Sequence, residues 1–319
     1  MRLLSTCVAL FLGASEALAG TYCISDTFVG RSFLSGFHHQ AIPDPSSGRV
    51  TYVDQATALK HNLTYADDDT LIIRADHTTK LNSTGPGRES VRIASNKQWT
   101  TSVTVVDIRH MPVGCATWPG LRTVADDNPI GEKIDIIEGV NDQGPNQISL
   151  HTLGNCTQPA QRSETGTAVS FDCNTHVSGN PGCGVKSDKA TSYGPQFNAV
   201  GGGWIAMERT STHISMWYWA RTDDPPNDII SGDDNIDPGS WGTPVAHFVN
   251  TQCDLDEQFG PNNIVINLTL CGGWAGSTFT SAGCPGTCVD YVNDNPAAFL
   301  DAYWEIASLR VYTPEMATR

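Results

Sequence analysis

Short β-branched and aromatic runs, separated by turns rich in glycine and proline, recur along the whole chain and limit what it can fold into. Such runs lie at residues 71–75, 103–108, 264–268 and 306–312. The chain has 30 glycines and 18 prolines, which is many for a helical protein, and no succession of strand and helix patterns is visible. We therefore predict an all-β fold in which two antiparallel sheets pack face to face.

One stretch predicts a β-hairpin with a tryptophan-rich arm. Residues 204–209 and 214–219 flank a polar turn at 210–213. Alternation along the second arm separates two faces, with Ile214, Met216 and Tyr218 on one and Ser215, Trp217 and Trp219 on the other. The tryptophan face is interpreted either as a platform for a sugar or as packing between the two sheets. Further along, residues 296–303 predict a short helix with Asn295 as its N-cap.

Residues 1–19 have the three parts of a secretory signal peptide. Arg2 supplies the positive region, residues 3–12 are mostly apolar, and residues 17–19 form a small-x-small cleavage site. We predict that this leader is followed by a single domain at 20–319, secreted to the extracellular space or the cell wall. No other segment is long and apolar enough to cross a bilayer, so we expect no membrane partner.

Sequons and cysteines agree with export. Four Asn-x-Ser/Thr sequons begin at Asn62, Asn82, Asn155 and Asn267, and together with the leader they predict a glycoprotein. Of the ten cysteines, Cys7 lies in the leader, which leaves nine for the mature chain. An oxidising compartment favours disulfides between most of these, and the odd number leaves one over, for which Cys23 is our candidate.

Charge and cysteine spacing narrow the range of partners. The chain has 34 acidic and 19 basic side chains and a formal net charge of −15, which argues against nucleic acid and against an anionic membrane surface. Cys284 and Cys288 are spaced like zinc ligands, but no second pair completes a site. The segment 232–237 contains three aspartates, but it is more typical of a solvated turn than of a calcium loop. We expect no metal, no cofactor and a monomer.

Residues 131–139 place acids among β-branched residues in a strand-like run. In a regular strand Lys133 and Asp135 share one face, and a β-bulge between Asp135 and Glu138 would bring Glu138 to that face as well. Three polar side chains would then form a row on one surface. A retaining glycosidase needs two carboxylates about 5–5.5 Å apart, and rows of this kind supply that distance. The alternative is an edge strand with solvated acids.

The chain resembles the fungal laminarinases of glycoside hydrolase family 16, secreted enzymes that cut internal β-1,3 bonds of β-glucans. The resemblance extends over about residues 20–312. It rests on ordered segments at 74–77, 90–93, 109–112, 115–119, 136–143, 150–152, 193–195, 271–276 and 288–292. It implies a curved antiparallel jelly-roll sandwich of the concanavalin-A-like kind. Such a sandwich has an open concave cleft for a β-1,3-glucan such as laminarin or fungal wall glucan.

The family motif is Glu-x-Asp-x-x-Glu, in which the first Glu is the nucleophile, the Asp holds the pair in register and the last Glu is the acid/base. Carried onto this chain, the motif assigns Glu138 to the acid/base position, Asp135 to the orienting position and Lys133 to the nucleophile position. A protonated amine cannot attack an anomeric carbon, and it adds positive charge where the transition state needs negative charge. Glu132 is the alternative nucleophile, although it lies one residue too early and pleat alternation turns it to the opposite face.

The resemblance also implies residues that contact the glucan. Trp118, Trp274 and His151 are the candidates, each with burial in the core as its alternative. Relatives carry tryptophans that line the cleft just before the motif, whereas here Arg122 and Asn128 fill those places. Part of the cleft therefore loses an aromatic surface for sugar stacking.

The sequence leaves three functional hypotheses. The first is a secreted β-1,3-glucan-directed pseudoenzyme, in which retaining hydrolysis of O-glycosyl bonds is lost or strongly reduced because of Lys133. The second is an active endo-β-1,3(4)-glucanase that uses Glu138 as acid/base and recruits Glu132 as nucleophile. The third is a structural extracellular protein without sugar binding.

Overall fold

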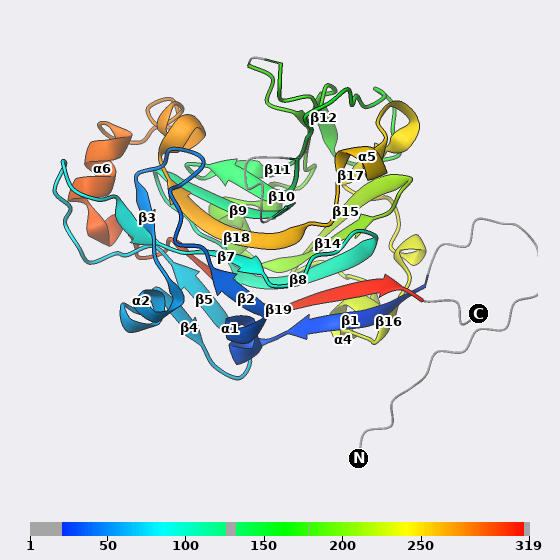
Figure 1. The fold of residues 1–319 in the computed structure, drawn as a ribbon, viewed down its shortest axis with the longest axis horizontal. Helices are drawn as coiled ribbons and strands as arrows, with labels where there is room; N and C mark the ends of the chain where they lie inside the picture. The colour runs from blue at the N-terminus through cyan, green and yellow to red at the C-terminus, as the bar shows by residue number, and fades with distance from the viewer. Residues whose placement is uncertain (1–20, 126–131, 178, 316–319) are drawn as a thin grey trace, which may run out of the picture.

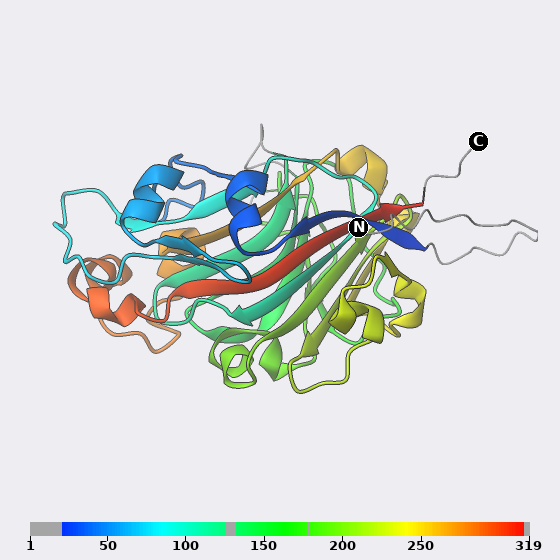
Figure 2. The same ribbon diagram turned by 90° about the horizontal axis from the view of Figure 1, so that it is seen from below.

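The computed structural model describes residues 21–125, 132–177 and 179–315, so the leader predicted at 1–19 lies outside the described residues. Two antiparallel sheets pack face to face and curve in the same sense, one on the concave side and the other on the convex side (Figure 1, Figure 2). This arrangement confirms the predicted all-β jelly-roll sandwich.

The convex sheet has nine strands within the described ranges. Their bounds are β1 Tyr22–Phe28, β4 Thr64–Ala66, β5 Leu71–Arg74, β8 Ser102–His110, β14 Gly203–Arg209, β15 His213–Ala220, β16 Asn235–Ile236, β17 Ala246–Val249 and β19 Tyr303–Pro314. The strands follow the order β16-β1-β19-β8-β14-β15-β17, with β5 also paired to β19 and β4 paired to β5. The neighbouring β14 and β15 are the predicted hairpin.

The concave sheet has eight strands in the same described part of the chain. Their bounds are β2 Phe37–His39, β7 Arg92–Ser95, β9 Thr117–Val124, β10 Lys133–Val140, β11 Gln143–His151, β12 Thr167–Ser170, β13 Cys183–Lys186 and β18 Asn263–Leu270. They follow the order β12-β13-β11-β10-β9-β18-β7-β2. The interpretation of β10 as an edge strand is therefore wrong, because β9 and β11 pair with it on both sides.

The remaining elements are short and lie in the connections. A separate parallel pair consists of β3 Val50–Tyr52 and β6 Arg88–Ser90. The helices are α1 Phe33–Gly36, α2 Gln55–Lys60, α3 Gly194–Ala199, α4 Asn227–Ser231, α5 Leu255–Gln258 and α6 Cys288–Asp294. Single turns of other helical types are η1 Gly30–Ser32, η2 Ala190–Ser192, η3 Pro238–Ser240, η4 Asn250–Gln252, η5 Gly272–Gly276 and η6 Pro296–Phe299. Where the chain is described, none of its helices has the length and apolarity to cross a membrane.

The helix predicted at 296–303 is much shorter in the structure. It is the single 3-10 turn η6, and no side chain caps it. The Asn295 side chain instead donates from Nδ2 to the carbonyl of Tyr291 in α6. Asn295 thus holds the predicted N-cap position but makes no side-chain cap there, and the element stays short because the chain returns to strand at Tyr303.

Strand β15 separates two hydrophobic clusters, as its alternation predicts. Ile214 and Met216 face the core between the sheets, whereas Trp217 and Trp219 face outward. Both tryptophans are buried edge-on against Trp241, with ring centroids 5.2 and 5.8 Å away. The tryptophan face is therefore neither a sugar platform nor packing between the sheets, because the connection that carries Trp241 covers it from outside.

Four disulfides cross-link the described chain, namely Cys115–Cys284, Cys156–Cys253, Cys173–Cys183 and Cys271–Cys288. Cys23 on β1 takes part in none of them, which agrees with the prediction. The first and last of these disulfides hold the connection between β18 and α6, which forms one wall beside the concave sheet.

One of the four sequons is closed to glycosylation by the fold. Asn267 on β18 is 2% exposed, and its Nδ2 donates to the Tyr52 hydroxyl at 3.1 Å. A buried and hydrogen-bonded amide has no room for a glycan, so the prediction of a glycosylation site is wrong at this position. Asn62, Asn82 and Asn155 are exposed.

Candidate active site

The centre of the concave sheet carries a β-bulge in β10. The pairing register shifts between Asp135 and Glu138 against β11, and between Asp135 and Ile137 against β9. Ile136 and Ile137 are consecutive, yet both are buried in the core between the sheets. The extra residue returns Glu138 to the face of Asp135, so the predicted bulge is confirmed.

Asn146 on β11 stabilises this bulge. Its Oδ1 accepts a hydrogen bond from the Glu138 N–H at 3.0 Å, and its Nδ2 donates to the Ile136 carbonyl at 2.8 Å. The Asn146 side chain is buried, so water cannot replace these bonds. They satisfy backbone groups beside the bulge and fix the position of Glu138.

Gly139 follows Glu138 at a point where the strand has no room for a side chain. A Cβ at this position would lie 2.5 Å from Cζ of Tyr193, closer than real side chains come. Tyr193 is fully buried beneath the strand, so its ring has little freedom to move. The glycine lets β10 approach this ring and so sets the depth of Glu138 in the sheet.

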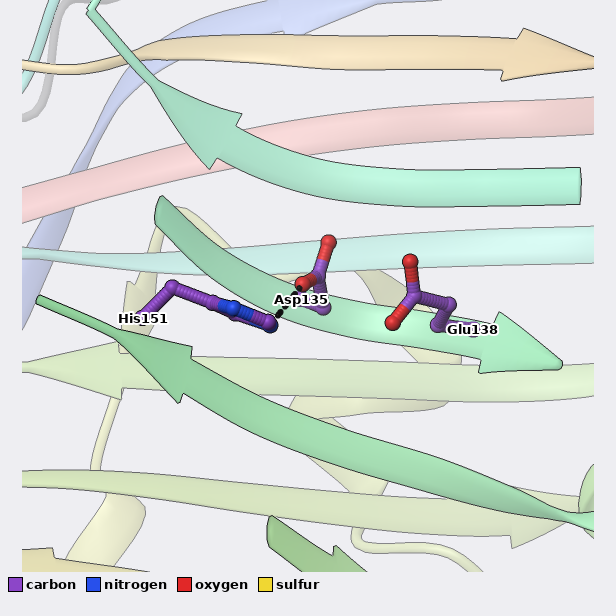
Figure 3. Close-up of side chains that lie close together, drawn as sticks. All are labelled: Asp135, Glu138 and His151. Carbon is purple, nitrogen blue, oxygen red and sulfur yellow. Dashed lines mark ion pairs between the residues drawn. The ribbon is translucent and has the colours of Figure 1, made fainter. Parts of the chain in front are cut away.

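Asp135 lies among basic side chains from three neighbouring strands. The Lys133 Nζ lies 2.8 Å from the Asp135 Oδ2. The His151 Nε2 on β11 lies 3.0 Å from the same oxygen (Figure 3). From β9, the Arg122 Nε lies 3.4 Å from the Asp135 Oδ1. Asp135 is wholly buried, while the Lys133 and His151 side chains remain 19% and 16% exposed towards the cleft.

Glu138 lies near the basic groups of Lys133 and Arg122, which also pair with Asp135. Its Oε1 accepts a hydrogen bond from Trp118 Nε1 at 3.2 Å. The Lys133 Nζ lies 3.8 Å and the Arg122 Nη2 3.9 Å from this oxygen. Two carboxylates and two cations therefore meet in one site, and their formal charges cancel.

The charges in this cluster shift the titration of its buried members. Burial alone would raise the pKa of the Asp135 carboxyl, but Lys133, Arg122 and His151 outweigh burial and hold that pKa well below its ordinary value. Burial alone would lower the pKa of the Arg122 guanidinium, but Asp135 and Glu138 outweigh it and raise that pKa. Both groups therefore stay charged across the physiological range.

Arg122 is a member of this cluster that the sequence did not predict as an ion-pair partner. It pairs with Asp135 across β9 and β10, and its guanidinium lies over Gly120, where a Cβ would come within 2.1 Å of Nη2. Gly120 is itself the cross-strand partner of Glu138, so this path brings Arg122 to both carboxylates. The signal in the sequence is the alternation that puts Trp118, Gly120 and Arg122 on one face of β9.

Glu132 lies outside the cluster. It precedes β10 in a bend, is half-buried, and makes none of the ion pairs found among the described residues. Of the two residues considered for the nucleophile position, Lys133 is the one whose side chain lies near Glu138, at 3.8 Å. Asn128, the second residue predicted to replace a cleft tryptophan, lies outside the described residues.

Trp118 and Trp274 lie beside the acids and are only partly buried. Their rings meet edge to face, with centroids 5.7 Å apart and an interplanar angle of 87°. Trp274 and Glu138 line a pocket of about 330 Å³ together with Gln143 and Lys186. An aromatic wall next to a carboxylate gives this pocket both an apolar and a polar surface for a sugar ring.

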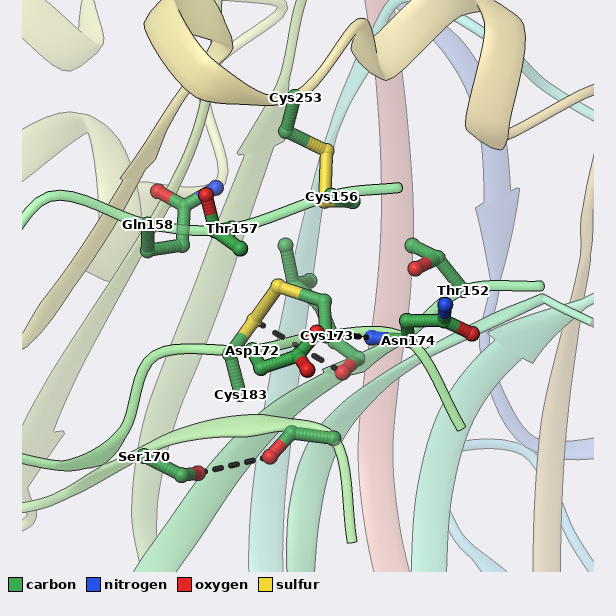
Figure 4. The surroundings of a disulfide bond; sticks show 12 residues. Thr152, Cys156, Thr157, Gln158, Ser170, Asp172, Cys173, Asn174, Cys183 and Cys253 are labelled. Carbon is green, nitrogen blue, oxygen red and sulfur yellow. Dashed lines mark hydrogen bonds between the residues drawn. A yellow bond between two sulfur atoms is a disulfide. The ribbon is translucent and has the colours of Figure 1, made fainter. Parts of the chain in front are cut away.

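The segment that follows His151 is held against the concave sheet by cross-links (Figure 4). The disulfides Cys156–Cys253 and Cys173–Cys183 lie side by side in this segment. The Thr152 N–H also donates to the carbonyl of Cys173 at 2.8 Å. These links fix the end of β11 and with it the position of His151.

Asp135, Glu138 and His151 also have the spacing of metal ligands, since one ligand atom from each lies within 4.8 Å of the others. Lys133 and Arg122 already neutralise the two carboxylates. A divalent cation would have to displace the Lys133 amine from its 2.8 Å contact and remain close to Arg122. The arrangement therefore fits an ion-pair cluster and does not fit a metal centre.

Comparison with protein families gives a match over most of the chain. Residues 37–312 match the sequence profile described as "XgeA-like, catalytic GH16 domain". A probable glycosidase of Schizosaccharomyces pombe is 41% identical over 298 residues, which cover 92% of this chain and 70% of that protein. A probable endo-1,3(4)-beta-glucanase of Neosartorya fischeri is also 41% identical, over 302 residues, and here the chain spans 46% of the relative's length.

Solved structures that are similar to this chain also come from GH family 16. The laminarinase 16A of Phanerochaete chrysosporium, in a GH16 structure with two beta-glucans (6-O-glucosyl-laminaritriose) in its donor and acceptor sites, has a TM-score of 0.90 and 58% identity. The match covers 92% of this chain and 100% of that one. An elongating GH family 16 beta-1,3-glucosyltransferase has a TM-score of 0.85 and 38% identity, with 92% and 100% coverage.

Proposed function

Because the chain belongs to glycoside hydrolase family 16, in its XgeA-like branch, we propose that it is directed to β-1,3-glucan and that its retaining hydrolysis is lost or strongly reduced. The observation that carries this proposal is the Lys133 amine, which lies 2.8 Å from Asp135 and 3.8 Å from Glu138. The position that the family motif gives to an attacking carboxylate thus holds a cation.

The mechanism of a retaining glycosidase explains why a lysine in place of the attacking carboxylate would stop hydrolysis. A retaining glycosidase needs one carboxyl group to protonate the leaving oxygen and a second to attack the anomeric carbon from the opposite face. Glu138 provides the first group, but Lys133 offers an ammonium where the second is needed. The ammonium also opposes the positive charge that develops on the sugar ring in the transition state, and Arg122 adds to this opposition.

Binding of glucan does not need the missing nucleophile. Trp118, Trp274 and His151 all border the site, and the pocket beside Glu138 is open to solvent. The relative with 58% identity holds beta-glucans in its donor and acceptor sites. We therefore assign substrate contact to these three residues, with Asp135 as the orienting acid and Glu138 at the acid/base position.

Three alternatives receive less support from the geometry. Glu132 as nucleophile requires its carboxylate near Glu138, whereas the contact with Glu138 comes from Lys133. A retaining glucosyltransferase needs the same attacking carboxylate as a hydrolase, so the likeness to such an enzyme does not restore activity. A structural protein without sugar binding would have no use for the half-exposed tryptophans beside the pocket.

Secretion is also part of the proposal. It is supported by the leader-like first 19 residues, by three exposed sequons, and by four disulfides of the kind that persist in oxidising compartments.

Two measurements test the proposed function. Reducing-sugar release from laminarin by the natural protein should stay at the level of a no-protein blank, and clear release would refute the loss of hydrolysis. Calorimetry with laminari-oligosaccharides, or sedimentation with insoluble β-1,3-glucan, should show binding. Absence of binding in both would favour the structural alternative.

A further inference from the structure

Four residues with a left-handed backbone gather at the base of the aromatic wall formed by Trp118 and Trp274. They are Ala116, Asn141, Asp142 and Cys271, with φ between 51° and 71°. Six non-glycine residues in the described ranges have a positive φ, so most of these conformations occur in one place. Alanine and cysteine rarely adopt this region, and such strain persists only where the surroundings hold it, often at functional sites.

Asn141 lies in the turn between β10 and β11 and bonds to the segment before Trp118. Its Oδ1 accepts a hydrogen bond from the Ala116 N–H at 2.8 Å, and its own N–H donates to the Thr117 carbonyl at 3.0 Å. The first bond holds a strained residue, since Ala116 has a φ of 71°. Asn141 is 2% exposed, so water does not replace these bonds. They fix the start of β9 and with it Trp118.

The same side chain bonds to the segment that carries Trp274. Its Nδ2 donates to the Ala275 carbonyl at 2.9 Å and lies 3.2 Å from the Thr278 Oγ1. The Thr278 hydroxyl in turn donates to the Trp274 carbonyl at 2.9 Å. Trp274 is therefore anchored by a set of bonds that begins at Asn141, three residues after Glu138 on the same hairpin.

We propose that Asn141 is a positioning residue for glucan binding. It sets Trp118 and Trp274 at their interplanar angle of 87° and holds both rings in place beside Glu138. This inference rests on the proposed function, because it needs a glucan that contacts the tryptophans. The Asn141 carbonyl also accepts a hydrogen bond from Gln143 Nε2 at 3.1 Å, and Gln143 lines the pocket next to Glu138. One residue thus orients the aromatic and a polar part of the same pocket.

The variant Asn141→Gly isolates the role of the side chain. Glycine adopts the left-handed turn freely but makes none of the three side-chain bonds. Asn198 offers a matched control, because its side chain also makes three hydrogen bonds, to the N–H and carbonyl of Met111 and to the His110 ring. None of these partners belongs to the aromatic wall. Thermal melts show whether Asn141→Gly and Asn198→Ala are folded.

Hydroxyl-radical footprinting, measured by peptide mass spectrometry on the full-length protein, gives the oxidation rate of each tryptophan. Asn141→Gly should raise the rates of Trp118 and Trp274 at least about twofold, because both rings lose their anchor. Trp241, which belongs to the outer cluster, should keep its rate, and Asn198→Ala should change none of the three. An equal rise at Trp241, or no rise at Trp274, overturns the positioning role.

The variant Asn141→Asp is milder and keeps the test open if the glycine variant does not fold. Aspartate retains an acceptor for the Ala116 N–H and tolerates the left-handed turn, but it has no donor for the Ala275 carbonyl. Oxidation should therefore rise more at Trp274 than at Trp118. Equal rates in this variant and in the natural protein would contradict the anchoring of Trp274 by the amide.

Calorimetry with laminaritriose connects the position of the rings to binding. Asn141→Gly should weaken the affinity at least about fivefold, and Asn198→Ala by less than about twofold. Higher oxidation of the tryptophans without a change in affinity, or equal losses of affinity in the two variants, overturns the proposal and leaves the proposed function standing. If the natural protein binds no laminaritriose, the proposed function fails and the role of Asn141 in binding fails with it.

Discussion

The Lys133 Nζ and the Asp135 Oδ2 are 2.8 Å apart, on side chains two positions apart along one face of the same strand. The bulge after Asp135 then adds Glu138 to that face. The backbone geometry that would align two carboxylates for retaining hydrolysis therefore aligns a cation between two acids. The loss proposed for this chain is a change of one side chain on an intact scaffold, and that makes it open to direct tests.

Restoring a carboxylate at position 133 should restore part of the hydrolysis. We expect Lys133→Glu to release reducing sugar from laminarin at least about tenfold faster than the natural protein, because it supplies the attacking group. Lys133→Gln is the matched control, since it removes the cation without adding a nucleophile. Equal rates for the two variants would show that a carboxylate at this position does not act as the attacking group.

The stability that Asp135 contributes should depend on pH. Folding lowers the pKa of this carboxyl, so its contribution is fully present above the unfolded value of about 4 and is lost as the pH falls below it. At pH 7 we expect Asp135→Asn to reduce the free energy of unfolding by about 3 kcal/mol, because Lys133 and Arg122 lose a buried partner. In urea unfolding series the difference should shrink below about pH 4. A difference that is independent of pH would contradict the ion-pair account.

Asn146 should contribute to stability although it is not among the residues predicted to contact the glucan. Asn146→Ala removes two buried hydrogen bonds to the backbone of the bulge and should cost about 2 kcal/mol in the free energy of unfolding. Glucan affinity should fall as well, because the bulge positions Glu138. Gln196→Ala, at an exposed position of α3, is a control expected to change stability by less than about 0.5 kcal/mol. Equal changes in the free energy of unfolding for the two variants would show that Asn146 does not stabilise the bulge.

A methyl group at position 139 should be poorly tolerated. Gly139→Ala would bring a carbon within 2.5 Å of the buried Tyr193 ring and should destabilise the fold by about 1–3 kcal/mol. Gly260→Ala adds the same methyl group where no atom lies within 4 Å. Thermal melts of the two variants compare close packing with the general effect of replacing glycine, and similar melting temperatures would count against the packing argument.

The motif residues were the part of the site that the sequence could predict. Two consecutive isoleucines before Glu138 can both reach the core only if the strand bulges, and this is where the register shifts. Lys133 at the first position of the motif is also visible in the sequence, since it needs no knowledge of the fold beyond strand alternation. The roles given to these residues rest on the family motif and stay predictions until the variants above are measured.

Contacts between distant segments account for what the sequence could not predict. Arg122 reaches Glu138 only because Gly120 leaves room across the strand pair, and that pairing is a property of the folded sheet. The sequon at Asn267 looks like the other three until the fold buries it under Tyr52. Trp217 and Trp219 show the right alternation for an exposed platform, but Trp241 from a later connection covers them.

Trp274 lies in a connection that has neither a strand nor a long helix to hold it, and this has a practical consequence. Cys271–Cys288 closes the loop around it and Cys115–Cys284 ties that loop to the turn before β9, so two disulfides, together with hydrogen bonds from Asn141, hold the tryptophan in place. Material made in a reducing cytosol would keep its sheets while this side of the groove loosened. Sugar affinity measured on such material would report on the host used for production as much as on the protein.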